Sequence, residues 1–296
     1  MIVREIHLVP DGIERVRLST YARSVFSGLP SRKGTDKAIK RGEVWINGTA
    51  AGTGDWVETG QLLELIDLQQ NNPKTYRLPL EVIYEDDHLA VINKPSGIEV
   101  SGNKFKTVEN ALAGSLNIPR HPDSLPWPRP VHRLDYSTSG LLLVAKSAGA
   151  QVDLGRQFEQ RRVHKRYCAV VAGKISESGQ INQPIDGLPA QSTYTAIQTV
   201  PSLRSGYLSL VHLFPTTGRT HQLRIHMASM GHPIVGDQKY GKAGHVLKGK
   251  GLFLASVELR FMHPASQQET TVSIAAPPKF TSLLEREQSR WNKFND

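Results

Sequence analysis

The pattern of hydrophobic and polar positions along this chain predicts short strands with few helices among them. Residues 141–145 are continuously apolar, which is typical of a strand buried on both faces. Residues 80–97 predict two further strands around an acidic turn. The chain shows no internal repeat and no regular alternation of strand and helix. We therefore expect an α+β fold in which helices pack on a mixed, mainly antiparallel sheet.

The first part of the chain predicts a small α/β domain of its own. Ser31 is suited to begin a helix that runs through Lys40, and residues 44–48 then predict a strand and a turn. Residues 59–65 predict a second turn and strand. The polar, proline-containing stretch that follows lacks hydrophobic periodicity and is typical of a linker. The expected boundaries are residues 1–68 for the small domain, 69–79 for the linker and 80–296 for the large domain.

Charge favours a polyanionic partner. The chain has 36 Lys and Arg against 27 Asp and Glu, a formal net charge of +9. No basic amphipathic helix with a hydrophobic face stands out, so nucleic acid is favoured over a membrane surface. Basic residues gather in the first half of the small domain, although charge alone would fit a solvated helix face equally well. Five of them are the expected RNA-binding residues of this domain: Arg32, Lys33, Lys37, Lys40 and Arg41.

The sequence also excludes several kinds of site. Cys168 is the only cysteine, so intrachain disulfides and a cysteine-based zinc site are ruled out. His221 and His226 are five residues apart and no Glu follows His221, so this is not the zinc-protease spacing and we expect no metal site. Charged residues interrupt residues 1–11, unlike a signal peptide, and no apolar run approaches membrane-spanning length. We expect a soluble, cytoplasmic protein.

One loop combines groups that can do chemistry. Arg133 and Asp135 stand two residues apart, and Gly140 separates their loop from the buried apolar run. Reactive side chains often lie on loops that a rigid element holds in place. On local composition alone, a surface turn with an incidental ion pair remains open.

A second candidate segment predicts a helix. Thr220 is suited to cap a helix that runs to Met230, with Gly231 as its stop. At about 100° per residue, Arg224 lies opposite the expected core face, and taken alone it would be a surface residue. The expected core face consists of Leu223, His226, Met227 and Met230.

A third candidate segment predicts a strand in which Lys165, Tyr167 and Ala169 share one face. A tyrosine in a strand is usually a packing residue. Basic residues flank it, and the sequence therefore leaves both a structural and a binding role open for Tyr167.

Several motifs together resemble the RluA-like pseudouridine synthases. In the order of that family, they are NKPSG at 93–97, HRLD at 132–135, KRYCA at 165–169, GRTHQLRIH at 218–226 and FMHP at 261–264. Residues 14–68 resemble the alpha-L RNA-binding motif, first known from a small-subunit ribosomal protein, with GEVWING at 42–48 as the clearest part. The resemblance covers most of the chain and implies a pseudouridine synthase catalytic domain preceded by an RNA-binding domain.

The resemblance also implies residue roles. Asp135 matches the catalytic carboxylate, Arg224 the arginine that pairs with it, and Tyr167 the tyrosine that stacks on the target uracil. Arg133 matches the arginine that enters the space vacated by the flipped base, whereas His132 has as much claim to a structural role as to a substrate contact. The full expected substrate-binding set is His132, Arg133, Arg219 and His221, and the expected RNA contacts of the large domain are Arg161, Arg162 and Lys165.

The implied reaction fits this set of side chains. Pseudouridine formation breaks a glycosidic bond, turns the uracil and rejoins it through carbon five, with no redox agent, metal or nucleotide cofactor. One carboxylate suffices, whereas a glycosidase normally needs two. We therefore expect an RNA pseudouridine synthase without cofactors, acting on large-subunit ribosomal RNA first and transfer RNA second, with no obligate protein partner. The alternatives are a non-catalytic RNA-binding or ribosome-assembly protein and a nucleoside-cleaving glycosidase.

Overall fold

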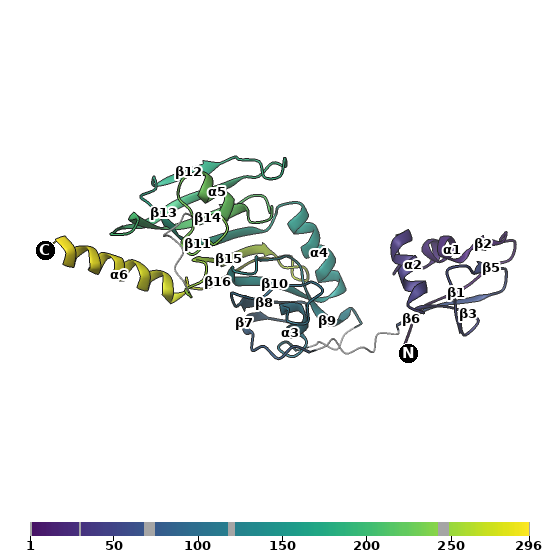
Figure 1. Ribbon diagram of the computed structural model, residues 1–296. Helices are drawn as coiled ribbons and strands as arrows, with labels where there is room; N and C mark the ends of the chain where they lie inside the picture. Colours follow the sequence, from purple (N-terminus) through teal and green to yellow (C-terminus); the bar gives the residue numbers. More distant parts are fainter. Residues whose placement is uncertain (1, 30, 68–74, 118–121, 242–248, 296) are drawn as a thin grey trace. The chain divides into compact units, whose positions relative to one another are not determined.

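The computed structural model describes residues 2–29, 31–67, 75–117, 122–241 and 249–295, and the chain divides into two units, Met1–Lys74 and Thr75–Asp296 (Figure 1). The predicted linker, residues 69–79, is therefore too long at its C-terminal end. Tyr76 and Leu78 pack against the core of the larger unit, and the Tyr76 backbone N–H donates to the Asn110 carbonyl at 2.9 Å. The larger unit begins at Thr75 because these apolar side chains are part of its core; residues 69–74 lie outside the described ranges.

The small unit contains the helices and strands that its sequence predicts. Its antiparallel four-stranded sheet has the order β1-β6-β3-β4. Ser31 begins the second helix, since its hydroxyl accepts a hydrogen bond from the Gly34 N–H at 3.1 Å. Asn47 and Gly48 both have positive φ, which is the backbone that a tight hairpin turn between β3 and β4 requires. The elements are β1 (Ile2–Leu8), β2 (Val16–Arg17), α1 (Leu18–Val25), α2 (Arg32–Lys40), β3 (Val44–Ile46), β4 (Thr49–Ala50), β5 (Trp56–Val57) and β6 (Leu62–Asp67).

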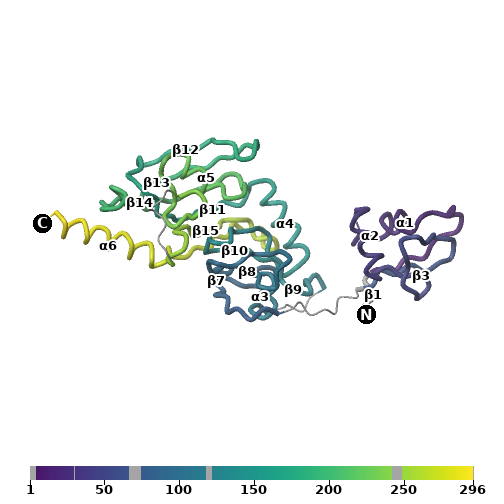
Figure 2. Tube along the Cα trace, viewed as in Figure 1, coloured from purple at the N-terminus to yellow at the C-terminus, as the bar shows by residue number. Residues whose placement is uncertain are grey.

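The large unit is built on a ten-stranded sheet. Eight strands follow the order β12-β13-β14-β11-β15-β10-β8-β7, while β16 pairs with β15 and β9 with β10. The trace in Figure 2 shows β7, β8 and β10 running side by side. The strands are β7 (Glu81–Glu85), β8 (Leu89–Lys94), β9 (Ser124–Pro130), β10 (Ser139–Ser147), β11 (His164–Ala172), β12 (Ser178–Ile181), β13 (Ser192–Ser202), β14 (Gly206–Pro215), β15 (Leu254–Met262) and β16 (Glu269–Ser273). The helices are α3 (Val108–Leu112), α4 (Ala148–Glu159), α5 (Gln222–Ser229) and α6 (Pro278–Asn295).

The pairing of strands confirms the predicted fold class. Among the described strands, every pairing is antiparallel except that of β10 with β15. Strand β10 is buried on both faces, as expected: Leu142 and Val144 join one apolar cluster, and Leu141, Leu143 and Ala145 join another. No helix in the described ranges is both long and apolar enough to cross a membrane.

The parallel junction of β10 and β15 sets the position of the loop that carries Asp135. Gly140, at the start of β10, has φ 109° and lies opposite Ser256. A Cβ atom on Gly140 would lie 2.1 Å from the Ser256 carbonyl oxygen. Only glycine permits both this backbone and this approach. The loop therefore enters the sheet directly beside β15, which pairs with β11 on its other side.

Candidate active site

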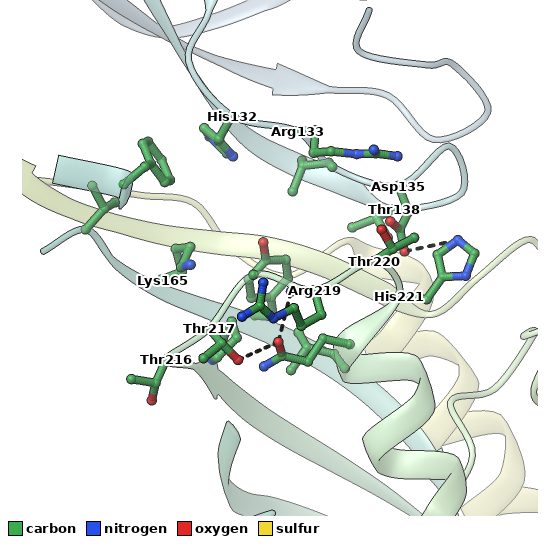
Figure 3. Close-up of a pocket in the computed structure, with 18 of the residues that line it drawn as sticks. His132, Arg133, Asp135, Thr138, Lys165, Thr216, Thr217, Arg219, Thr220 and His221 are labelled. Atoms are coloured by element: carbon green, nitrogen blue, oxygen red, sulfur yellow. Dashed lines mark hydrogen bonds and ion pairs between the residues drawn. The ribbon is translucent and has the colours of Figure 1, made fainter. Parts of the chain in front are cut away.

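A cavity of about 470 Å³ lies where the Asp135 loop, β11 and the start of α5 meet. Asp135, His221 and Thr220 lie near one end of it, and Lys165 and Thr216 near the other (Figure 3). Its lining brings together residues from distant parts of the chain, including Asp135, Tyr167 and Arg219. Three of the candidate segments predicted from the sequence therefore meet in one place.

Asp135 presents a partly exposed carboxylate to this cavity, with 17% of its side chain accessible. Its Oδ2 lies 3.5 Å from Arg224 Nη1 and 3.9 Å from His221 Nε2. Burial lowers the pKa of His221 despite the opposing charge of Asp135, so the imidazole is neutral near pH 7. Arg224 is then the cation that pairs with the Asp135 carboxylate.

The loop around Asp135 is held by Lys94, a fully buried residue of β8. Lys94 Nζ donates to the carbonyl oxygens of Pro95 at 2.9 Å and Thr138 at 2.8 Å. The Gly97 N–H also donates to the Tyr136 carbonyl at 2.8 Å. These bonds explain in physical terms why an NKPSG segment accompanies the HRLD segment: the first restrains the backbone of the second.

Arg224 is buried, with 7% of its surface accessible, and its main partner is a residue that the sequence did not indicate. Its Nε and Nη2 donate to the two carboxylate oxygens of Asp237 at 2.7 and 2.8 Å. Although burial opposes charge on both, the hydrogen bonds between them raise the pKa of Arg224 and lower that of Asp237. From the helix pattern alone, Arg224 would be a surface residue. That prediction is wrong, because Asp237 and Asp135 cover its guanidinium.

Tyr167 and Lys165 both line the cavity from β11, in agreement with the predicted shared face. Burial and then the charge of Asp135 raise the pKa of Tyr167, so its hydroxyl stays protonated at neutral pH. Burial also lowers the pKa of Lys165, whose Nζ lies 6.0 Å from the Phe158 ring centroid. The intervening residue, Arg166, pairs instead with Glu258 of β15.

His132 also lines the cavity, but its contacts are structural. Its Nε2 accepts a hydrogen bond from the Leu143 N–H at 3.0 Å, and its ring stacks on Phe158 with centroids 4.6 Å apart. Burial, reinforced by the charge of Lys165, lowers the pKa of His132 to about 3, so the ring is neutral. The bond from Leu143 and the stack on Phe158 favour the structural role that the sequence left open for His132. The substrate contact expected of His132 stays a prediction.

The other expected substrate contacts lie on the cavity wall. Arg133 is exposed there, and Arg219 is held by a bond from its Nε to the Pro189 carbonyl at 3.2 Å. Arg161 lines the cavity as well, whereas Arg162 is exposed outside its lining. Their roles in binding RNA stay predictions.

Helix α5 begins one residue later than predicted. His221, rather than Thr220, occupies the N-cap position, with φ 57° and no capping bond from its side chain. Its Nδ1 lies 3.0 Å from the Tyr240 hydroxyl, which fixes the ring beside Asp135. Gly231 follows the helix with φ 82°, as predicted for a helix stop. The predicted core position of Met230 is wrong: the helix has already ended at Ser229, and Met230 is 37% exposed.

Asp237 and Tyr240 were not among the residues predicted from the sequence. They lie in the segment GDQKYG at 236–241, whose flanking glycines are the one local signal. A Cβ atom on Gly236 would lie 2.0 Å from the Gly251 carbonyl oxygen, and one on Gly241 would lie 2.2 Å from that of Asp237. Such close backbone approaches are typical of a tightly built turn, and in this turn the Lys239 and Tyr240 N–H groups also donate to Asp237.

The basic residues predicted to bind RNA in the small unit lie on and just after α2. They are Arg32, Lys33, Lys37, Lys40 and Arg41, and none of them is buried. Arg41 differs from the rest because its Nη2 lies 2.7 Å from Glu43, which neutralises part of its charge. Their role in binding RNA stays a prediction.

Comparison with known proteins supports the family resemblance. Residues 88–229 match the family described as RNA pseudouridylate synthase. The chain is 34% identical to ribosomal large subunit pseudouridine synthase D of Nitrosomonas europaea, over 94% of this chain and 86% of that protein. It is 37% identical to the dual-specificity RNA pseudouridine synthase RluA of Pasteurella multocida, over 68% of this chain and 94% of that protein.

A solved structure agrees with both sequence relatives. Human RNA pseudouridylate synthase domain containing 1 superposes with a TM-score of 0.55 at 28% identity, over 67% of this chain and 84% of that chain. The residues that match the family include the Asp135 loop, β11 and α5, which together form the cavity. The chain therefore belongs to the family of RNA pseudouridylate synthases, isomerases that convert uridine to pseudouridine in RNA.

Proposed function

We propose that this protein isomerises specific uridines of large-subunit ribosomal RNA, with Asp135 as the reacting carboxylate. The observation that carries the proposal is the placement of Asp135: its carboxylate faces the cavity, 3.5 Å from an arginine that Asp237 holds from the other side. Ribosomal RNA is favoured because relatives that align with most of this chain are named ribosomal large subunit pseudouridine synthases. Transfer RNA is the second candidate substrate.

The first chemical step needs a carboxylate near the sugar of the target uridine. Asp135 either adds to the anomeric carbon as the bond to uracil N1 breaks, or removes the 2′ proton so that the uracil leaves as its anion. In both cases the electron pair of the glycosidic bond passes to the uracil. Arg224 supplies the positive charge that faces this carboxylate, with its Nη1 3.5 Å from Asp135 Oδ2.

The second half of the reaction returns the same uracil to the same sugar. The uracil turns within the cavity and its C5 bonds to the anomeric carbon. In the addition route the ester bond between Asp135 and the sugar breaks in this step, and in the elimination route Asp135 returns its proton to C2′. The C5 proton is then lost and N1 is protonated. No reagent is consumed, so the cavity has only to retain the base and exclude water. A neutral Tyr167 supplies a face on which the detached ring can stack throughout.

Binding precedes this chemistry, because a paired uridine must leave its stack at a cost of a few kcal/mol. Arg133 lies on the cavity wall, and its planar guanidinium is suited to replace the base in the stack. Arg161 and Lys165, which also line the cavity, are suited to bind phosphates. The basic helix α2 of the small unit adds affinity through phosphates without reading sequence.

The test is to map pseudouridines in the cell's own RNA with and without this protein. We expect one or more sites in large-subunit ribosomal RNA to lose pseudouridine, and to regain it with the wild-type chain but not with Asp135→Asn. Both chains should accumulate to the same level, since Asn has the size of Asp. Restoration of every site by Asp135→Asn would refute the catalytic assignment, and loss confined to transfer RNA would change the substrate.

A further inference from the structure

A second hollow, of about 350 Å³, adjoins the Asp135 loop and has no part in the chemistry above. Asp135 lines only the active-site cavity of these two, and the next residue, Tyr136, lines only the second hollow. Consecutive Cα atoms are about 3.8 Å apart. Two neighbouring residues of one loop therefore serve two adjacent depressions.

The second hollow presents aromatic surface to solvent. Tyr136 is 59% exposed, and Tyr76 contributes a second ring to the lining. Phe105 is 48% exposed and meets the ring of Tyr76 edge to face, with centroids 5.7 Å apart. Exposed aromatic side chains that gather in this way are typical of binding sites.

The charge around these rings suits an anionic ligand with a flat, apolar part. Lys104 and Lys106 both line the hollow. Lys104 pairs with Glu99 at 2.7 Å, while Lys106 is exposed and forms no ion pair within the described ranges. A base with its phosphate has this combination of properties.

Hydrogen bonds within the chain hold the segments around the second hollow. Asn110 Nδ2 donates to the Phe105 carbonyl at 2.8 Å, and Thr107 caps α3 through a bond from the Asn110 N–H. On the other side, Ser96 Oγ donates to the Ser137 carbonyl at 2.8 Å. Both segments that carry the exposed rings are held, so little ordering entropy opposes binding.

We propose that this hollow binds the base of the nucleotide next to the target uridine, stacked on Tyr136, with its phosphate near Lys106. The inference rests on the proposed function, because it takes the uridine at Asp135 as the reference point. A neighbouring nucleotide of the same strand is the ligand favoured by position, since Tyr136 directly follows Asp135. Splayed, unpaired bases stacked on aromatic side chains are the usual way in which single-stranded RNA is recognised.

The test uses two stem-loop RNAs, each with one loop uridine and the fluorescent base 2-aminopurine on either its 5′ or its 3′ side. Complexes are formed with Asp135→Asn chains, so that turnover does not interfere. With Tyr136 intact, we expect quenching of 2-aminopurine on one of the two sides. Tyr136→Phe should retain it, and Tyr136→Ala should lose it and raise the Kd by about 5- to 150-fold, the effect of one base–aromatic stack.

Two controls separate a local effect from misfolding. Tyr207 is also an exposed tyrosine of the large unit, 44% accessible, and Tyr207→Ala should leave the quenching unchanged. Lys106→Gln removes an exposed charge, and we expect it to lower the slope of log Kd against log salt by about 0.7. Turnover of the wild-type chain on its natural RNA reports the proposed function separately.

The inference would be overturned if, on both RNAs, the Tyr136→Ala chain quenched 2-aminopurine as much as the chain with Tyr136 intact. It would also be overturned if Lys106→Gln left the slope of log Kd against log salt unchanged. Loss of quenching with Tyr207→Ala as well would show a non-specific effect and would also overturn it. A protein that quenches as expected yet forms no pseudouridine in any RNA would retain this binding site and lose the proposed function.

Discussion

Arg224 donates two hydrogen bonds to Asp237, at 2.7 and 2.8 Å, and this pairing leaves Nη1 as the nitrogen that faces Asp135 at 3.5 Å. One guanidinium thus lies between two carboxylates, one nearly inaccessible and one open to the cavity. The arrangement assigns different tasks to the two acids. Asp237 orients the cation, while the Asp135 carboxylate stays accessible from the cavity.

Asp237 should support turnover through this orientation of Arg224. Asp237→Asn keeps the size of the side chain but leaves Arg224 with a weaker, neutral acceptor. We expect the single-turnover rate to fall by about 10- to 100-fold, the range found when a partner that orients a metal-ligating side chain is removed, with a much smaller change in RNA affinity. Asp186→Asn, an exposed aspartate with positive φ that Asn also tolerates, is the matched control. A rate within twofold of wild type would show that Arg224 needs no second carboxylate.

Lys94 should make the stability of the large unit depend on pH. Burial lowers the pKa of Lys94 to about 8, against the opposing effect of Asp135, while the unfolded chain has its ordinary value of 10.5. Between these values the unfolded state binds more protons, so the free energy of unfolding rises with pH. Urea unfolding at a series of pH values measures this. Between pH 8 and 10.5, we expect the free energy of unfolding of the wild-type chain to rise by up to about 3 kcal/mol more than that of Lys94→Met. A constant difference across that range would contradict the assignment.

Tyr167 should act through its ring rather than its hydroxyl. Since the pKa of Tyr167 is raised by burial, the phenol does not ionise at neutral pH and is not a base there. We expect Tyr167→Phe to keep the single-turnover rate within about tenfold, and Tyr167→Ala to lose considerably more, since it removes a stack worth about 1–3 kcal/mol. Equal rates for the two variants would argue against stacking.

His132 should behave as a structural residue. Its pKa of about 3 keeps it neutral at ordinary pH, so we expect no step from His132 in the pH–rate profile near its usual pKa. His132→Phe would leave the Leu143 N–H without its acceptor, and we expect a loss of about 1–3 kcal/mol in unfolding free energy. A variant with unchanged stability but a lower affinity for RNA would instead restore the substrate role.

The basic helix of the small unit should supply affinity that depends on salt. Replacing Arg32, Lys33, Lys37 and Lys40 with Gln should reduce the slope of log Kd against log salt by about 0.7–0.9 for each phosphate that they neutralise. Turnover at saturating RNA should change little, because these residues belong to the other unit. Arg41→Gln alone should have a smaller effect, since Glu43 already pairs with Arg41. An unchanged slope would remove the RNA-binding role from this helix.

Local pattern was enough to predict several elements, and the family resemblance pointed to the residues of the candidate site. The apolar run at 141–145, the cap at Ser31 and the turn at Asn47 are each set by side chains within a few residues, and the structure contains all three. The motifs around Asp135, Tyr167 and Arg224 likewise identified side chains that the structure brings to one site. Helix ends were less well predicted, because a cap depends on backbone angles such as φ 57° at His221.

The partners of those side chains depended on contacts between distant segments. Arg224 looked like a surface residue because the helix pattern contains no information about Asp237, 13 positions later, or Asp135, 89 positions earlier. Lys94 restrains a loop 44 positions away, and Gly140 is required by the carbonyl of Ser256 on a parallel strand. Sequence patterns report the preferences of a residue's own backbone and face. Burial and the charge of a partner arise only when separate strands and loops pack together, and these decide how each group is oriented and ionised.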